Sequence, residues 1–209
     1  MFRDVLDQVN KYIKEHIYTL TGHELYDLKK GFYEKSVEYM GHSQNLTGIT
    51  ELILNMFFTH FVSELNLPYS IERTKKIAGL NGRKNEIDIV LINEIGLVKY
   101  GISVKRELGL AGWKDHETNT PLYKELKERY GCQNNLIQDF FRLDNIKRGP
   151  NGYFPSVTIF FEDVSPQYHG IMRRIENDHP YYRYIVLKQH KNSLFEDLKE
   201  KLKISLHSS

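Results

Sequence analysis

The stretch that decides the fold is NEIDIVLINEIGLVKYGISVKRELG, which runs from Asn85 to Gly109. It contains two apolar runs on either side of the turn NEIG, a pattern that predicts two antiparallel strands joined by a short connection. The first run carries a carboxylate at Asp88, and the second ends in an amine at Lys105. Strands that only fill a core do not need these charges, so the pair marks a candidate site.

Side chains along a strand point alternately to opposite faces of the sheet. Glu86 and Asp88 should therefore share one face of the first strand, while the isoleucines on either side of Asp88 point the other way. Ser103 and Lys105 should share a face of the second strand. If the two strands pair across the turn, the acid, the hydroxyl and the amine converge over a surface whose other side is buried.

This grouping suits metal-assisted hydrolysis of a phosphodiester. Mg²⁺ is a hard cation that prefers oxygen ligands, so Asp88 could hold it. The amine of Lys105 could orient the attacking water and stabilise the negative charge on the phosphate. The plain alternative is a hairpin with one solvated face and a cross-strand ion pair.

The rest of the chain predicts one α/β domain, a mixed sheet with helices on both faces. A capping box at Thr21 and Glu24 marks the start of the second helix. The expected helices are 2–20, Thr21 to Met40, Thr47 to Leu65 (after a break at 41–45), Leu122 to Arg129, Gln133 to Ile146, Tyr168 to Glu176 and Ser193 to Leu202. The expected strands are Tyr69 to Thr74, Glu86 to Ile92, Val98 to Glu107, 156–163 and 182–188.

Composition narrows the class of protein. At 209 residues, 40% of them hydrophobic, the chain is long enough for one domain with a full core. It has no apolar run near the length of a membrane span and no secretory signal, so we expect a cytoplasmic protein without a membrane partner. The single cysteine, Cys132, excludes a thiolate zinc finger, and the lack of a GxxxxGK loop argues against a nucleotide cofactor.

The runs NEIDIV and YGISVK resemble the signature of the PD-(D/E)xK nuclease superfamily, an acid on one strand and (D/E)xK on the next. The expected order of elements from Thr47 to Asp163 is similar to the αβββαβ core of that superfamily. The resemblance implies a restriction-endonuclease-like mixed sheet, with a helical extension over 1–44, a catalytic core over 45–165 and a helix-strand-helix decoration over 166–209. It implies a Mg²⁺-dependent DNA endonuclease, with Mn²⁺ as an alternative ion.

The resemblance also assigns roles to residues. Asp88 corresponds to the metal ligand and Lys105 to the catalytic lysine, and Glu86 matches an E-x-D variant of the motif. Glu51 lies where many members place a further metal-binding glutamate, although it also belongs to a polar stripe of its helix. Ser103 departs from the pattern, because a hydroxyl replaces a carboxylate.

The missing acid at Ser103 has several candidate replacements. Glu117 in WKDHETN is the first choice, followed by Glu107 and Glu125. With a replacement, the chain would be an active nuclease, either a type II restriction endonuclease or a repair or junction-resolving enzyme. Without one, it would be a non-catalytic nucleic-acid-binding or assembly module.

Basic and amide side chains are the candidates for contact with DNA. They are Arg83, Lys84, Arg106, Gln133, Gln138 and Arg142, to which Lys147 and Arg148 add further positive charge. Because cutting both strands of a duplex requires two active sites, we expect a homodimer.

Overall fold

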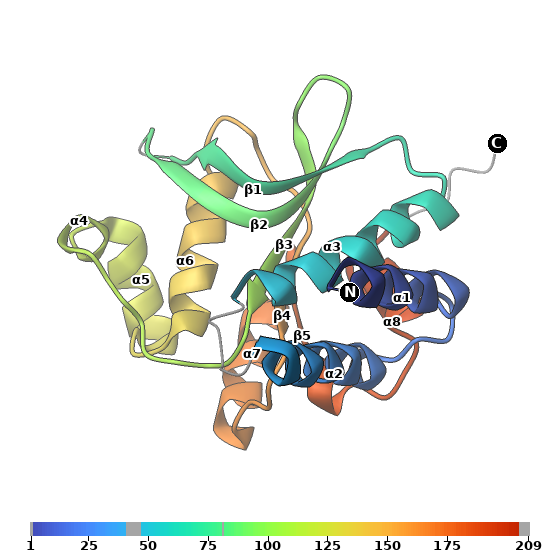
Figure 1. Cartoon of the computed structure of the whole chain (residues 1–209). Coiled ribbons are helices and arrows are strands. Elements are labelled where there is room, and N and C mark those ends of the chain that lie inside the picture. The colour runs from blue at the N-terminus through green and yellow to red at the C-terminus, as the bar shows by residue number, and fades with distance from the viewer. Residues whose placement is uncertain (1, 41–46, 81, 205–209) are drawn as a thin grey trace.

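The computed structural model describes residues 2–40, 47–80 and 82–204 (Figure 1). The predicted break at 41–45 and the boundary between 44 and 45 lie outside these residues. The helices are α1 (Phe2–Glu15), α2 (Gly22–Met40), α3 (Thr47–Glu64), α4 (Asp115–Thr118), α5 (Pro121–Tyr130), α6 (Asn135–Lys147), α7 (Pro166–Asp178), the 3₁₀ turn η1 (Leu187–Gln189) and α8 (Leu194–Lys201). The strands are β1 (Ser70–Ala78), β2 (Lys84–Ile92), β3 (Val98–Lys105), β4 (Ser156–Phe160) and β5 (Tyr182–Val186).

The five strands form one mixed sheet in the order in which they occur along the chain, β1-β2-β3-β4-β5. β1, β2 and β3 are antiparallel neighbours, whereas β3, β4 and β5 run parallel to one another. The expected α/β class with a mixed sheet is therefore confirmed. Within the described residues, no helix is both long enough and apolar enough to cross a membrane.

Helices cover both faces of the sheet, and each face has its own core. Side chains of α1, α2, α3 and α8 form one buried cluster with the sheet, in which Ile13, Phe32 and Phe61 pack with Ile102. The helices α5, α6 and α7 form the second cluster on the opposite face. The first two helices therefore complete a layer of the domain, because their apolar side chains share a core with the sheet.

Most element boundaries agree with the sequence prediction to within a few residues. The capping box is confirmed, with the Thr21 backbone N–H donating to Glu24 Oε2 at 2.7 Å and the Glu24 N–H donating to Thr21 Oγ1 at 3.1 Å. Four details differ. The first helix, expected over 2–20, ends at Glu15 and is followed by turns at 16–19. The short helix α4 lies between the expected strand that ends at Glu107 and the expected helix that begins at Leu122, where no helix was predicted. β1 extends to Ala78, and α6 begins at Asn135 instead of Gln133, with the Asn134 side chain accepting from the Ile137 N–H.

The hairpin of β1 and β2 bends at Thr74 and Asp88. Residues on both sides of this position pair across the ladder, but Thr74 has a left-handed φ of 54° and is not paired with Asp88. Ile87 packs in the core under α5, α6 and α7, whereas Ile89 packs in the core on the opposite face. The prediction that both isoleucines point the same way is therefore wrong, because the bend interrupts the strand's alternation.

The tip of the same hairpin is attached to the end of α6. The Leu80 N–H donates to the carbonyl oxygen of Asn145 at 2.9 Å. Gly149 lies so close to Ala78 and Gly79 that a Cβ at this position would be 2.7 Å from the Ala78 carbonyl oxygen. The β1–β2 hairpin therefore reaches from the sheet to the carboxyl end of α6, and this arrangement encloses one side of a cleft.

Candidate active site

The site begins where β2 and β3 separate. Their last paired residues at this end are Ile89 and Ile102. Beyond this pair, Asp88 Oδ2 accepts the Val104 backbone N–H at 2.6 Å and lies 3.1 Å from Ser103 Oγ. The carboxylate thus replaces the next backbone hydrogen bond of the ladder. These bonds reach only Oδ2, which leaves Oδ1 for another partner.

A second carboxylate, Asp139 of α6, lies beneath this point. Its Oδ1 is 2.8 Å from Ser103 Oγ and 3.1 Å from the Lys105 ammonium, and it also accepts a hydrogen bond from Arg142. Its Oδ2 accepts the Thr158 hydroxyl at 2.8 Å. Asp139 therefore joins the lysine of β3 to the neighbouring strand β4 and to its own helix.

The environment of Asp139 keeps it ionised although only 2% of the residue is exposed. Burial raises the pKa of the carboxyl, because a charge is less stable away from water. The charges of Lys105 and Arg142 and hydrogen bonds from Ser103 and Thr158 outweigh burial and lower the pKa to about 2. The interior thus holds a carboxylate with two cations as counter-ions.

Ser103 bridges the two carboxylates. Its hydroxyl has one proton, so it can donate to Asp88 or to Asp139 but not to both at once. Arg142 Nη2 donates to the same oxygen at 3.0 Å and lies 4.0 Å from Asp88 Oδ2. The residue that departs from the nuclease motif is thus a buried link between the two acids.

Glu51 of α3 approaches the site from the other face of the sheet. Burial and the nearby charge of Asp88 raise the pKa of Glu51, and Arg73, whose guanidinium is 3.9 Å from Glu51, acts in the opposite direction. Glu86 also raises this pKa. The negative charges of Asp88 and Glu86 therefore act against ionisation of Glu51.

The acids can be compared with the needs of a Mg²⁺ ion. Among residues 2–40, 47–80 and 82–204, no group of three or more His, Cys, Asp and Glu side chains is arranged to hold a metal. Mg²⁺ is often held by only one or two carboxylates, with water and substrate phosphates as its other ligands. Asp88 meets this smaller requirement through its Oδ1, and Glu51, whose pKa is raised by the charge of Asp88, is the other acid considered for the ion. Asp139 does not meet the requirement, because both of its oxygens are already bonded.

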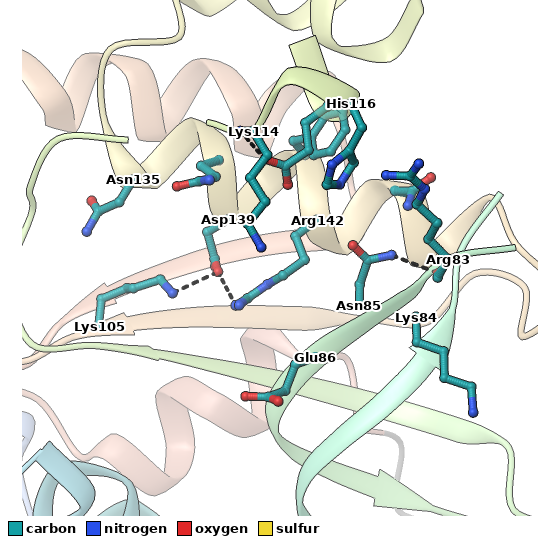
Figure 2. Close-up of a pocket in the computed structure, with 14 residues that line it drawn as sticks. Arg83, Lys84, Asn85, Glu86, Lys105, Lys114, His116, Asn135, Asp139 and Arg142 are labelled. Carbon is teal, nitrogen blue, oxygen red and sulfur yellow. Dashed lines mark hydrogen bonds and ion pairs between the residues drawn. The ribbon is translucent and has the colours of Figure 1, made fainter. Parts of the chain in front are cut away.

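A cleft of about 510 Å³ opens over Lys105 and Asp139 (Figure 2). The β1–β2 hairpin forms one wall, α6 forms the floor, and α4 with the residue before it forms the opposite wall. The charged side chains in the lining are the cations Arg83, Lys84, Lys105, Lys114 and Arg142 and the acids Glu86, Glu117 and Asp139. Cations outnumber acids, so the cleft favours an anionic ligand.

The three glutamates expected to replace the missing acid have other partners. Glu117 accepts the Lys114 backbone N–H at 2.8 Å and thereby caps α4, although it also lines the cleft. Glu125 lies 3.8 Å from Arg148, and Glu107 pairs with its neighbour Arg106. In the part of the chain that the structure describes, the acid that contacts Ser103 and Lys105 is Asp139.

The candidate DNA-binding residues separate into two groups. Arg83, Lys84, Gln138 and Arg142 line the cleft, whereas Arg106 and Gln133 do not. The Gln138 amide is bonded to both backbone groups of Gly112, at 3.0 and 2.9 Å. Arg142 bonds inward to Ser103 and Asp139. Gln138 therefore fixes the wall before α4, and Arg142 fixes the floor of the cleft. The exposed cations of the opposite wall are Arg83 and Lys84 of the hairpin.

Lys147 is buried and cannot contact DNA. It is 1% exposed, and its ammonium donates to Ser156 Oγ at 2.6 Å and to the Tyr181 carbonyl oxygen at 2.9 Å. The expectation that it grips phosphates is wrong, because the side chain is enclosed by the core under the sheet.

The sequence contains a signal for Asp139. The residue lies in the apolar stripe of α6, three residues after Leu136 and four before Leu143, where an ionisable side chain must be buried. Buried acids require partners, so this position predicts a cation nearby.

Comparisons of the chain with protein-family models, with curated proteins and with solved structures found no match. The functional argument therefore depends on the geometry of the site.

Proposed function

We propose that this protein is a Mg²⁺-dependent nuclease of the PD-(D/E)xK type, with a restriction-endonuclease-like fold, that hydrolyses phosphodiester bonds of DNA. One observation carries the proposal: Asp88 and Lys105 lie on the two strands that separate at Ile89 and Ile102, and Lys105 opens into a cleft in which cations predominate. The strand order agrees, since three antiparallel strands are followed by a crossover helix and a parallel strand.

The side chains divide the work of such a reaction. Asp88 and Glu51 would hold Mg²⁺, and the bound ion would stabilise the charge that develops on the phosphate. Lys105 would donate hydrogen bonds to phosphate oxygens from the edge of the cleft, where 20% of its side chain is exposed. Asp139 would keep the amine of Lys105 in place, and Ser103 would connect Asp139 to Asp88. The acid absent from the strand motif is thus replaced in its positioning role by a residue of α6.

Cleavage of supercoiled plasmid tests the proposal. We expect the protein to cut it with Mg²⁺ or Mn²⁺ and not with EDTA. Asp88→Asn and Lys105→Ala should each lower the rate by at least about 100-fold, because each removes charge stabilisation at the phosphate. Lys99→Ala is the matched control, since Lys99 lies on the same strand outside the cleft lining.

Two results would contradict the nuclease proposal. One is cleavage that persists at the normal rate in Asp88→Asn or Lys105→Ala. The other is plasmid left intact by wild-type protein that a cooperative thermal transition has shown to be folded.

One observation favours a second candidate function, a non-catalytic nucleic-acid-binding module on the same fold. Lys105 and Arg142 are already ion-paired with Asp139, and the described residues contain no group of three metal ligands. Such a module would bind DNA in EDTA, without any need for Mg²⁺, and would leave the DNA intact when Mg²⁺ is added. The plasmid assay and a binding assay together separate the two functions.

The expected homodimer is part of the proposal, because a nuclease that cuts both strands needs two sites. Light scattering of the full chain measures its mass directly. A monomer that nicks one strand would retain the chemistry and exclude the dimer.

A further inference from the structure

We propose that Lys114 and His116 form a binding site for the phosphate backbone of a nucleic-acid strand, on the wall of the cleft opposite the β1–β2 hairpin. This inference rests on the proposed function, since it concerns the ligand of the same cleft. It assigns a role to two residues at α4 that the sequence motif does not include.

The wall that carries these residues is held firmly against α6. Asn135 Oδ1 accepts the Gly109 N–H at 3.1 Å, and the Gln138 amide is bonded to both backbone groups of Gly112. The Trp113 indole donates to the Cys132 carbonyl oxygen and packs against Tyr123 and Phe141. A side chain that follows this segment is therefore presented from a fixed backbone, which reduces the entropy lost when it binds a ligand.

The charge balance of the cleft makes Lys114 the important cation of this wall. Asp139 and Asp88 together offset the charges of Lys105 and Arg142, because Asp139 contacts both cations and Asp88 lies 4.0 Å from Arg142. Among the ion pairs of the described residues, none involves the ammonium of Lys114, and this side chain is exposed. Although the carboxylate of Glu117 lines the same cleft, it bonds to the backbone of Lys114, so the ammonium stays available to an anion.

The direction of the side chains agrees with this role. Figure 2 shows Lys114 and His116 reaching from α4 over Asp139 and Arg142, toward the middle of the cleft. Lys84, on the opposite wall, directs its ammonium away from the centre in the same view. A strand whose phosphate lies at Lys105 would therefore pass beneath Lys114 and His116, which would hold a neighbouring phosphate.

DNA binding measured without cleavage tests this inference. Fluorescence anisotropy of a labelled duplex of about 24 base pairs, in EDTA and over a series of NaCl concentrations, gives the affinity and its salt dependence. For duplex DNA, a plot of log K against log salt concentration has a negative slope, and each lost phosphate contact makes this slope less steep by about 0.9. At 0.1 M salt this corresponds to about eightfold weaker binding. We expect this change for Lys114→Ala and a further loss of affinity for Lys114→Ala/His116→Ala.

Lys124→Ala is the matched control. Lys124 is an exposed lysine on the adjacent helix α5, outside the cleft lining, so its removal changes the net charge equally without removing the proposed contact. Its slope should equal that of the wild type.

The outcomes separate this inference from the proposed function. Wild-type binding with an unchanged slope in Lys114→Ala would overturn the phosphate site and leave the nuclease proposal intact. An equal loss in Lys124→Ala would also overturn it, because the effect would then be one of net charge. If the wild type binds neither duplex nor single-stranded DNA at low salt, the proposed function itself fails. A loss of affinity seen only with RNA would overturn DNA as the ligand.

Discussion

Asp139 carries a full negative charge inside the protein because four side chains surround it. Lys105 and Arg142 supply positive charge, and Ser103 and Thr158 supply hydroxyl groups. A buried carboxylate lowers the stability of the fold only a little while every partner is present. Removal of its charge leaves the two cations without this counter-ion. The same carboxylate therefore supports both the fold and the position of the proposed catalytic amine.

We predict that Asp139→Asn lowers the free energy of unfolding by about 3 kcal/mol at neutral pH, since the amide cannot neutralise two partly buried cations. Urea unfolding followed by circular dichroism measures the change. Asp7→Asn on the exposed side of α1 is the control and should stay within about 0.5 kcal/mol of the wild type. A small effect at Asp139 would mean that Lys105 and Arg142 find water in place of the carboxylate.

The pH dependence of stability gives a second prediction at this residue. The pKa of Asp139 is about 2 in the folded protein against an ordinary 3.8, so the folded state releases this proton more readily than the unfolded chain. The resulting stabilisation, about 2 kcal/mol, is present above pH 4 and is lost as the pH falls toward 2. Urea unfolding at several pH values should therefore show a shallower acid loss in Asp139→Asn. Identical acid profiles for the two proteins would contradict the prediction.

At the scale of elements, local patterns predicted the hairpin of β2 and β3, and the structure brings Asp88 and Ser103 together at the end of that hairpin, although the bend at Asp88 interrupts the alternation on which the prediction relied. Asp139 comes from α6, whose position depends on packing of the crossover between β3 and β4, so spacing along the chain could not place it. The partners of Glu117 and Gln138 were unpredictable for the same reason, because each bonds to a backbone group of the irregular segment before α4.

Gln138 and Gln133 provide a matched test of this segment. Gln138→Ala removes both bonds to Gly112, and we expect a loss of about 1–3 kcal/mol in stability together with faster amide exchange over 109–114. Gln133→Ala truncates an exposed side chain outside the cleft lining and should have neither effect. Hydrogen exchange read by mass spectrometry resolves the two variants. Equal protection of 109–114 in both would show that Trp113 and Asn135 hold the segment without Gln138.

At the scale of the whole molecule, the β1–β2 hairpin and α6 form two sides of the cleft and contact each other at one end. The hairpin bends away from the sheet near Thr74, and its tip is bonded to the end of α6 at Leu80. Arg83 to Glu86 of this hairpin line the cleft opposite α4. The shape of the cleft consequently depends on a contact between backbones at Gly149, at the far end of α6.

Gly149→Ala should weaken the contact between the hairpin tip and the end of α6. Its Cβ would lie 2.7 Å from backbone atoms of Ala78 and Gly79, so one chain must move, and we expect a loss of about 1–3 kcal/mol in thermal or urea unfolding. Gly31→Ala is the control, because its Cβ would meet no atom within 4 Å and alanine favours the helix interior, which predicts a gain of about 0.5–1 kcal/mol. A Gly149→Ala protein as stable as the wild type would show that the contact adjusts freely.

The agreement of strand order with chain order has a consequence for how the molecule forms. Each strand pairs only with strands that precede or follow it directly in the sequence, so the sheet can grow from the amino end as the chain leaves the ribosome. We expect the parallel pairing of β3 with β4 to be the slowest of these steps, because the 50 residues between the two strands must first close into a loop. Since α6 lies in the segment that closes, Asp139 reaches Lys105 only when β4 pairs with β3, and we expect the candidate site to form together with that pairing.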